Sequence, residues 1–359
     1  LYATSLVFTY RTASVVRSIH PVAGALTGGT LVSVYGSGFV DAVGAQCMFG
    51  LAAVHARVLS AGMLECVSPS PAEAGYVSVE VTMNGQDFST DAVLFEYQPA
   101  VEVHALEPSR GPVAGGTYVN VTGAGFSQRA ALLGYLSCRF NLTVVAAVWV
   151  SSFEVHCVAP EHPTGVVSVE LTLNDQQYTT DGVHFEYQDV VAHSIEPLNG
   201  PVEGGTRLSV LGAHFRESAT LRCRFEESSS AVVARYVDAS QLECATPAQS
   251  GSGSRLVEVS MNAQQFSSGD VAFTYVASAM VSSVWPERGA AEGGTPITVY
   301  GANFLSVSEQ LDYLHCRFST RVIRATLLDD HTLVCNTSAS FPGHVPLAVT
   351  LNARDFSQS

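Results

Sequence analysis

The eight cysteines are the residues of this sequence whose spacing most directly suggests chemistry, either disulfide formation or metal binding. They fall into four pairs separated by 19 or 21 residues: Cys47 and Cys66, Cys138 and Cys157, Cys223 and Cys244, and Cys316 and Cys335. A tetrahedral metal site needs four ligands, and a single pair without paired histidines supplies too few. We therefore predict four disulfides, each contributing roughly 3 kcal/mol through loop closure. Such disulfides indicate an extracellular or cell-surface location.

The sequence shows no arrangement of residues that is typical of a catalytic site. The eleven histidines are scattered, and none recurs beside a nucleophile and an acid. Glycine turns such as residues 36–39 are too short for a dinucleotide loop. Asp329 and Asp330 lack calcium-loop spacing and are interpreted as turn residues. Three arginines on the outward phase of "C-x-F" strands are interpreted as solvated: Arg139, Arg224 and Arg317. We expect no enzyme activity, no cofactor and no metal.

The charge of the chain argues against two classes of partner. Its 359 residues carry 32 acidic and 17 basic side chains, a formal net charge of -15. Nucleic acid and anionic lipid surfaces would repel such a chain. No apolar run reaches the roughly 18 residues that a spanning helix needs. The sequence therefore predicts neither nucleic-acid binding nor membrane insertion.

An internal repeat positions the cysteine pairs. The triplet "GGT" begins at Gly28, Gly115, Gly204 and Gly293, spaced by 87, 89 and 89 residues, and a proline stands nine residues before each threonine. Runs such as "VSVEVTMN" alternate apolar and polar residues with a period of two, which is typical of half-buried antiparallel strands. No segment has a helical period. One turn position is expected to be left-handed in every block: Gly38, Gly125, His214 and Asn303.

Blocks of this size with short alternating strands predict two-sheet sandwiches of about seven strands. The fold class is therefore all-β, with four tandem β-sandwiches, and the short linkers predict an elongated rod. The expected segments are 1–13 (an orphan closing strand), 14–98, 99–188, 189–276 and 277–359, the last being incomplete.

The residues together resemble a known family. A proline near the domain start, "P-x-x-G-G-T", "V-x-G-x-x-F", "C-x-F", a second "C-x-x-P", "V-x-V-x-x-N" and a closing "F-x-Y" are similar to the IPT/TIG domains, in four copies over essentially the whole chain. The DNA-binding branch of that family uses basic loops, which this acidic chain lacks. The resemblance implies that the four tandem β-sandwiches are immunoglobulin-like. It also implies an extracellular structural or adhesive array without enzyme activity.

Three N-glycosylation sequons fit an extracellular protein, beginning at Asn120, Asn141 and Asn336. Asn120 is expected on the outward phase of its strand. Asn141 and Asn336 are expected to follow inward residues into turns. Chance occurrence of this common triplet is the alternative.

The N-terminal stretch "SLVFTY" matches the closing strand of the later blocks. Leu6, Phe8 and Tyr10 correspond to Val93, Phe95 and Tyr97, whereas the fourth block ends before such a stretch. An open last domain would expose an unpaired strand edge. Donation of the N-terminal strand to the last domain of another copy would cover that edge. Burial of the three side chains would contribute roughly 5 to 8 kcal/mol gross.

Two functions follow from this pattern. The first is a subunit that polymerises head to tail into a filament by donor-strand exchange, with other copies of itself as partners. The alternative is a fragment of a larger receptor or adhesin ectodomain, for which glycans and cell-surface proteins are candidate partners. A carbohydrate-binding accessory region of an enzyme is a third interpretation.

Overall fold

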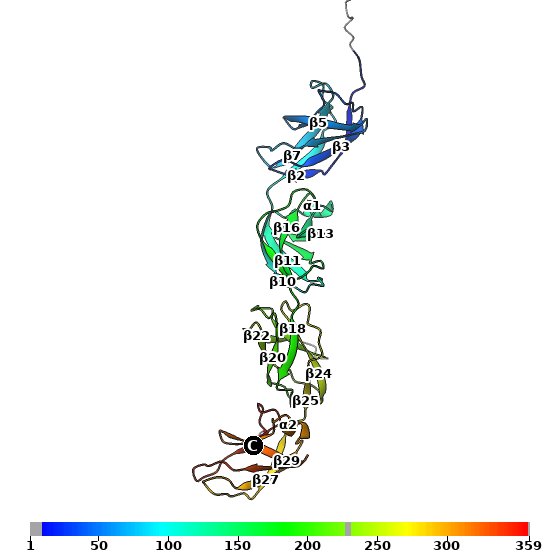
Figure 1. Cartoon of the computed structure of the whole chain (residues 1–359). Coiled ribbons are helices and arrows are strands. Elements are labelled where there is room, and N and C mark those ends of the chain that lie inside the picture. The colour runs from blue at the N-terminus through cyan, green and yellow to red at the C-terminus, as the bar shows by residue number, and fades with distance from the viewer. Residues whose placement is uncertain (1–8, 227–230, 358–359) are drawn as a thin grey trace, which may run out of the picture. The chain divides into compact units, whose positions relative to one another are not determined.

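The computed structural model describes residues 9–226 and 231–357, which form four sandwich domains in chain order (Figure 1). Two compact units are present. The first holds domains 1 and 2 up to Tyr187, and the second holds domains 3 and 4 from Gln188 onward, together with Arg110–Val113.

Domain 1 shows how the alternating strands form two layers. Its strands are β1(Val15–His20), β2(Ala23–Ala25), β3(Leu31–Ser37), β4(Gln46–Phe49), β5(Ala52–Ser60), β6(Met63–Val67), β7(Gly75–Thr82) and β8(Val93–Gln98). They pair in the order β1-β3-β6-β5-β4-β7-β8-β2. β2 runs parallel to β8, and the other neighbouring strands are antiparallel. One layer ends and the other begins at β5.

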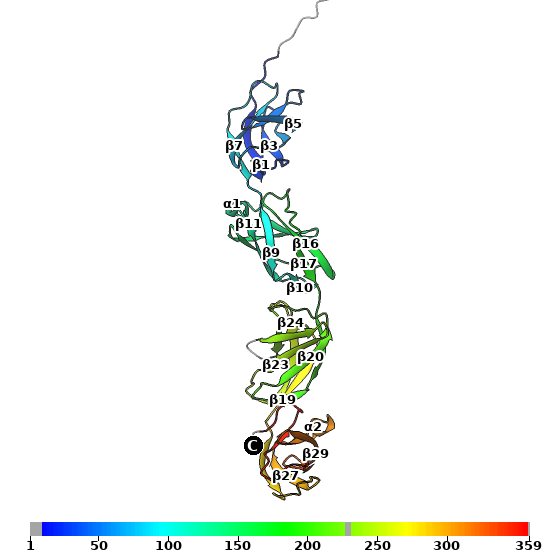
Figure 2. The same ribbon diagram turned by 90° about the vertical axis from the view of Figure 1, so that its left-hand side faces the viewer.

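The other domains repeat this order with local changes. The elements of domain 2 are β9(Glu102–Glu107), β10(Arg110–Gly111), β11(Tyr118–Ala124), α1(Gln128–Leu132), β12(Ser137–Phe140), β13(Thr143–Ala146), β14(Val148–Ser151), β15(Glu154–Val158), β16(Gly165–Thr172) and β17(His184–Tyr187). Its layers contain β17-β16-β12-β13 and β14-β15-β11-β9, with β9 beside β11 in Figure 2.

Domain 3 has the same eight-strand order as domain 1. Its strands are β18(Val191–Glu196), β19(Asn199–Pro201), β20(Arg207–Ala213), β21(Arg222–Phe225), β22(Val232–Asp238), β23(Gln241–Ala245), β24(Gly253–Ser260) and β25(Ala272–Val276). The elements of domain 4 are β26(Met280–Trp285), β27(Pro296–Ala302), α2(Ser306–Gln310), β28(His315–Phe318), β29(Arg321–Asp329), β30(Thr332–Asn336) and β31(Leu347–Thr350).

A small residue marks the strand that passes between the layers. Residues 52–55 of β5 pair with β4, and residues 56–60 pair with β6. At the switch, the buried Ala56 donates its N–H to the main-chain oxygen of Ala45 at 3.0 Å. Three alanines make the equivalent bond at 3.0 to 3.1 Å: Ala147, Ala234 and Ala325. In domain 2 the switch divides the strand into β13 and β14.

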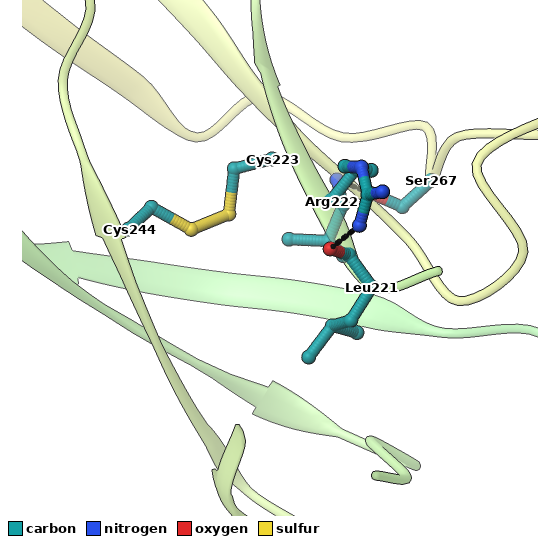
Figure 3. The surroundings of a disulfide bond; sticks show 6 residues. Leu221, Arg222, Cys223, Cys244 and Ser267 are labelled. Carbon is teal, nitrogen blue, oxygen red and sulfur yellow. Dashed lines mark hydrogen bonds between the residues drawn. A yellow bond between two sulfur atoms is a disulfide. The ribbon is translucent and has the colours of Figure 1, made fainter. Parts of the chain in front are cut away.

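The four predicted disulfides are confirmed, and each joins the two layers of one domain. Cys47 on β4 and Cys66 on β6 have Cα atoms 6.3 Å apart, and the other three pairs span 6.4 Å. All eight cysteines are buried. Figure 3 shows the Cys223–Cys244 bridge, with Arg222 donating to the main-chain oxygen of Leu221 at 2.8 Å.

The predicted left-handed turn is also confirmed. The φ angles are 79° at Gly38, 80° at Gly125, 67° at His214 and 68° at Asn303. The proline that precedes each "GGT" follows a cis peptide bond: Pro21, Pro108, Pro197 and Pro286.

The two short helices were not predicted. α1 and α2 contain five residues each, which is too short to produce a helical period in the sequence. Ser127 caps α1 by accepting a hydrogen bond from Ala130 N at 3.2 Å. Each helix buries one small residue, Ala130 or Ser308.

The closing strand supplies the largest side chains of each complete core. Phe95 and Tyr97 on β8 are buried with ring centroids 5.0 Å apart in an edge-to-face arrangement. The same pair recurs at 4.9 Å in domain 2 and 5.0 Å in domain 3: Phe185 with Tyr187, and Phe273 with Tyr275. Burial raises the pKa of all three tyrosines to about 12.

These tyrosines predict alkaline destabilisation of domains 1 to 3. In the unfolded chain they ionise near the ordinary tyrosine pKa of 10.0, whereas in the folded domains they stay neutral until about 12. Their contribution is complete below pH 10 and declines above it, reaching a loss of roughly 2 to 3 kcal/mol per tyrosine. The free energy of unfolding of domain 2, measured in urea by Trp149 fluorescence in a Trp285→Phe background, should fall between about pH 10 and pH 12.

Tyr187→Phe is the matched control because it removes only the titrating hydroxyl. Domain 2 of this variant should lose much less stability over the same pH range. An equal loss with and without the Tyr187 hydroxyl would show that another group causes the effect.

Candidate functional site

The predicted donor strand is described only in part. Leu6 and Phe8 lie outside the described residues. Tyr10 lies outside any strand and is 91% exposed. Donation of this segment to another copy therefore stays a prediction.

Within the described residues, the outer edge of β31 in domain 4 meets Phe356 and Ser357 rather than a further strand. Its pairing order is β26-β27-β30-β29-β28-β31. β31 corresponds to residues 257–260 of β24 in domain 3, which pair with β21, whereas residues 253–256 of β24 pair with β25. β31 pairs with β28, and no strand equivalent to β25 occurs in the described part of domain 4.

A cavity of about 500 Å³ lies beside this edge within the second unit. Val349 and Leu351 line it from the end of domain 4, together with Ala279 and Phe356. Gly200 contributes from domain 3. The walls are partly apolar, and the main chain of Val349 beside them is bonded to Ser357, whose N–H donates to Val349 O at 2.7 Å and whose hydroxyl accepts from Val349 N at 3.0 Å.

The phenylalanine of the "C-x-F" strand is less buried in domain 4 than in the other three domains. Phe49, Phe140 and Phe225 are buried in domains 1 to 3, whereas Phe318 of domain 4 is only half-buried. In domain 3, Phe225 packs edge-to-face on Phe273 of the closing strand, with centroids 6.2 Å apart. Phe318 has no such neighbour among the described residues, so part of its ring stays accessible.

The sequons differ in accessibility. Asn141 is exposed, with φ of 54°, in the turn between β12 and β13. Asn336 is exposed at the end of β30. Asn120 lies in the middle of β11, half-buried between partners on β9 and β15, and its Oδ1 is enclosed. Asn141 and Asn336 are therefore the accessible acceptors.

A polar joint connects domains 1 and 2, and it begins with a preorganised loop after β16. Asn174 Oδ1 accepts hydrogen bonds from the N–H groups of Gln176 at 3.2 Å and Gln177 at 3.1 Å. Asp175 between them adopts a left-handed φ of 60°. This turn directs the side chains of Gln176 and Gln177 toward domain 1.

The receiving surface is the "GGT" turn of domain 1. Gln176 binds both main-chain groups of Leu31, accepting from its N–H at 2.8 Å and donating to its oxygen at 2.9 Å. Gln177 accepts from the Thr30 hydroxyl at 3.0 Å and donates to the oxygen of Gly29 at 3.3 Å. The side-chain amides thus satisfy groups of this turn that water would otherwise bind.

The second unit repeats this joint between domains 3 and 4. Asn352 Nδ2 donates to the main-chain oxygen of Asn199 at 3.1 Å and to Asp355 Oδ2 at 2.7 Å. The buried Thr206 hydroxyl donates to Asp355 Oδ2 at 2.5 Å. Gly200 of β19 lies so close to Thr206 that a Cβ at this position would overlap Thr206 Oγ1.

The three arginines predicted to be solvated are instead held on the sheet surface, which corrects that interpretation. Each guanidinium lies over an aromatic ring at 3.8 to 4.1 Å: Arg139 over Tyr178, Arg224 over Phe266 and Arg317 over Phe356. Arg139 and Arg224 also pair with Glu170 and Glu258 on the neighbouring strands. In domains 2 to 4, the aromatic residue four positions after the "N" of the block therefore covers an arginine of the sheet and stabilises it.

The acidic pair of domain 4 forms a turn. Asp329 Oδ1 accepts from His331 N at 2.8 Å, and Asp330 Oδ1 lies 2.6 Å from His331 Nδ1. The hydrogen bond from His331 N lowers the pKa of Asp329. All three side chains are exposed.

Comparison with known proteins identifies the four sandwiches. The IPT/TIG domain model matches residues 14–97, 102–187, 191–275 and 279–359. The chain belongs to the IPT/TIG domain family. These matches and the four disulfides confirm the all-β architecture of four tandem immunoglobulin-like domains.

The IPT/TIG chain has relatives among much longer proteins. Fibrocystin-L of Homo sapiens is 25% identical over 342 residues, covering 93% of this chain and 8% of the relative. Plexin A3 of Danio rerio is 26% identical over 213 residues, covering 57% of this chain and 11% of the relative. The solved extracellular region of plexin A4 aligns with 92% of this chain and 35% of its own, with 13% identity and a TM-score of 0.42. The chain spans about a tenth of the length of these curated relatives.

The four buried disulfides are typical of proteins that fold in an oxidising compartment and reach the cell exterior. In the part of the chain that the structure describes, neither helix has the length or apolar character to cross a membrane.

The joint between domains 3 and 4 makes a testable contribution to stability. Thr206→Val removes the hydroxyl that donates to Asp355, so a partly buried carboxylate loses a hydrogen bond, at a cost of roughly 1 to 3 kcal/mol. Hydrogen exchange of β27 to β30 should report this loss in domain 4. Thr295→Val is the matched control, because the Thr295 hydroxyl accepts a hydrogen bond within its own turn, from Ala290 N at 3.3 Å. Equal effects of the two substitutions would contradict a role for the joint.

Proposed function

We propose that this chain is a segment of the extracellular region of a larger cell-surface receptor or adhesin, in which IPT/TIG domains form a non-catalytic structural and interaction array. The observation that carries the proposal is that each of the four family matches contains a buried disulfide joining its two layers. The alignment with fibrocystin-L over 93% of the chain supports it. The acidic charge also favours protein or glycan partners over nucleic acid.

An antibody raised against the chain tests this proposal on cells of the source organism. We expect a cell-surface polypeptide larger than 37.9 kDa after deglycosylation, with glycan mapped to Asn141 and Asn336 rather than Asn120. Asn120→Gln should leave the glycan mass unchanged and serves as the control. Detection of the antigen only in the cytosol would contradict the proposal. A polypeptide of 37.9 kDa found only in fibres would favour the second candidate function.

The partly accessible Phe318 and the cavity of domain 4 favour that second candidate, a head-to-tail filament. Here residues 1–10 of another copy would pair with residues 343–346, the counterparts of the residues of β24 that pair with β25, and fill the cavity beside Val349 and Leu351. Leu6, Phe8 and Tyr10 have the alternation of the strands that close domains 1 to 3. Such a strand would also cover Phe318, as β25 covers Phe225 in domain 3.

Phe8→Asp tests strand donation. The substitution would place an unpaired carboxylate in an apolar cavity, at a cost of several kcal/mol, so assembly measured by sedimentation should be lost. Phe341→Asp is the matched control, because Phe341 is 93% exposed in domain 4. A peptide of residues 1–11 added to a chain lacking residues 1–10 should stabilise domain 4 without restoring polymers. Filaments from the Phe8→Asp protein equal to those of the parent would exclude this candidate.

A further inference from the structure

The loop after β7 in domain 1 has the conformation of the two loops that form the domain joints. Asn84 Oδ1 accepts hydrogen bonds from Gln86 N at 3.0 Å and Asp87 N at 2.9 Å. Asn84 Nδ2 donates to Asp87 Oδ2 at 2.8 Å, as Asn352 does to Asp355. Gly85 provides the left-handed residue, with φ of 74°. The loop is thus preorganised without a neighbouring domain on it.

The accessibility of this loop differs from that of its counterparts. Asn174 and Asn352 are buried by the domain that each contacts. Residues 84–87 are all exposed. The hydrogen-bonding groups that join domains elsewhere in the chain are therefore available to a partner at domain 1.

Domain 4 displays the complementary half of the joint. Gly293 and Gly294 have φ of 79° and 78°, close to the 75° and 85° of Gly204 and Gly205, which precede the docked Thr206. Thr295 is half-buried, whereas the docked Thr30 and Thr206 are fully buried. The turn has the geometry of a receiving surface and remains partly accessible.

We propose that residues 84–87 form a docking surface for the "GGT" turn of another IPT/TIG domain. In the complex, the threonine hydroxyl of the turn donates to Asp87 Oδ2, as Thr206 does to Asp355. Asn84 Nδ2 donates to a main-chain oxygen equivalent to that of Asn199. The partner is identified by the two joints already formed within this chain, and the proposal does not require strand donation.

The chemistry of Asp87 makes the surface selective. A carboxylate only accepts hydrogen bonds at neutral pH, so it requires a donor from the turn, which the threonine hydroxyl supplies. Gln86 adds less when domain 4 is the partner. Gln176 accepts from the N–H of Leu31, but the equivalent Pro296 has no N–H. Asn84 and Asp87 should therefore provide most of the binding to this turn.

Cross-linking of two copies of the chain tests the proposal. All eight native cysteines are in disulfides, so only introduced thiols react with a short bismaleimide. A Gln86→Cys protein mixed with a Pro296→Cys protein places the two thiols at the positions where Gln176 meets Leu31. The control partner is Leu328→Cys, at an exposed residue of β29 in the same domain. We expect about tenfold more mixed dimer with Pro296→Cys than with the control.

Three further variants separate docking from random collision and from strand donation. Asp87→Ala in the Gln86→Cys protein, or Thr295→Val in the Pro296→Cys protein, should reduce the mixed dimer to the control level. Hydrogen exchange of the uncoupled proteins verifies that both remain folded. Phe8→Asp should leave the yield unchanged, because the docking surface does not include that strand. Equal yields with both partners, or a yield insensitive to Asp87→Ala, would overturn the proposal.

Discussion

The buried disulfide between the two layers is the constraint on which each domain depends. A domain of this size has a small core, and the disulfide fixes the distance between its sheets at the centre of that core. Ala56 is paired with Cys66 at the point where β5 leaves one layer for the other. A larger residue than alanine at this corner would compete for space with the disulfide. The covalent bond and the small corner residue therefore act together to hold the layers in register.

The closing strand fills the part of each complete core that the disulfide does not occupy. Its phenylalanine and tyrosine fill the core beside the second layer and are among the largest fully buried side chains of domains 1 to 3. In domain 4 the described residues include no such pair, and Phe318 stays partly accessible there.

The joints between domains use polar rather than apolar chemistry. In both units, an asparagine first organises its own loop and then, with a residue three positions later, satisfies groups of a "GGT" turn. The glycines allow close approach, and the threonine supplies a hydroxyl directed at the neighbouring domain. Such a surface can stay exposed in water without promoting aggregation, unlike an apolar patch. The same polar loops and turns therefore connect two domains when they are in contact, and remain stable in water when no domain covers them.

Repetition and local periodicity allowed the sequence alone to determine the four sandwiches, the disulfide pairs and the left-handed positions at His214 and Asn303. Each of these depends on residues near one another in the chain, and four copies made the register clear. The tertiary structure alone decided that Gln176 binds Leu31, 145 residues away, and that Arg224 lies over Phe266. It also decided the short helix α1, which has too few residues for a periodic signal. Contacts between side chains that are distant in the sequence depend on which loops lie next to each other in the folded chain, and the periodicity of the sequence does not specify this.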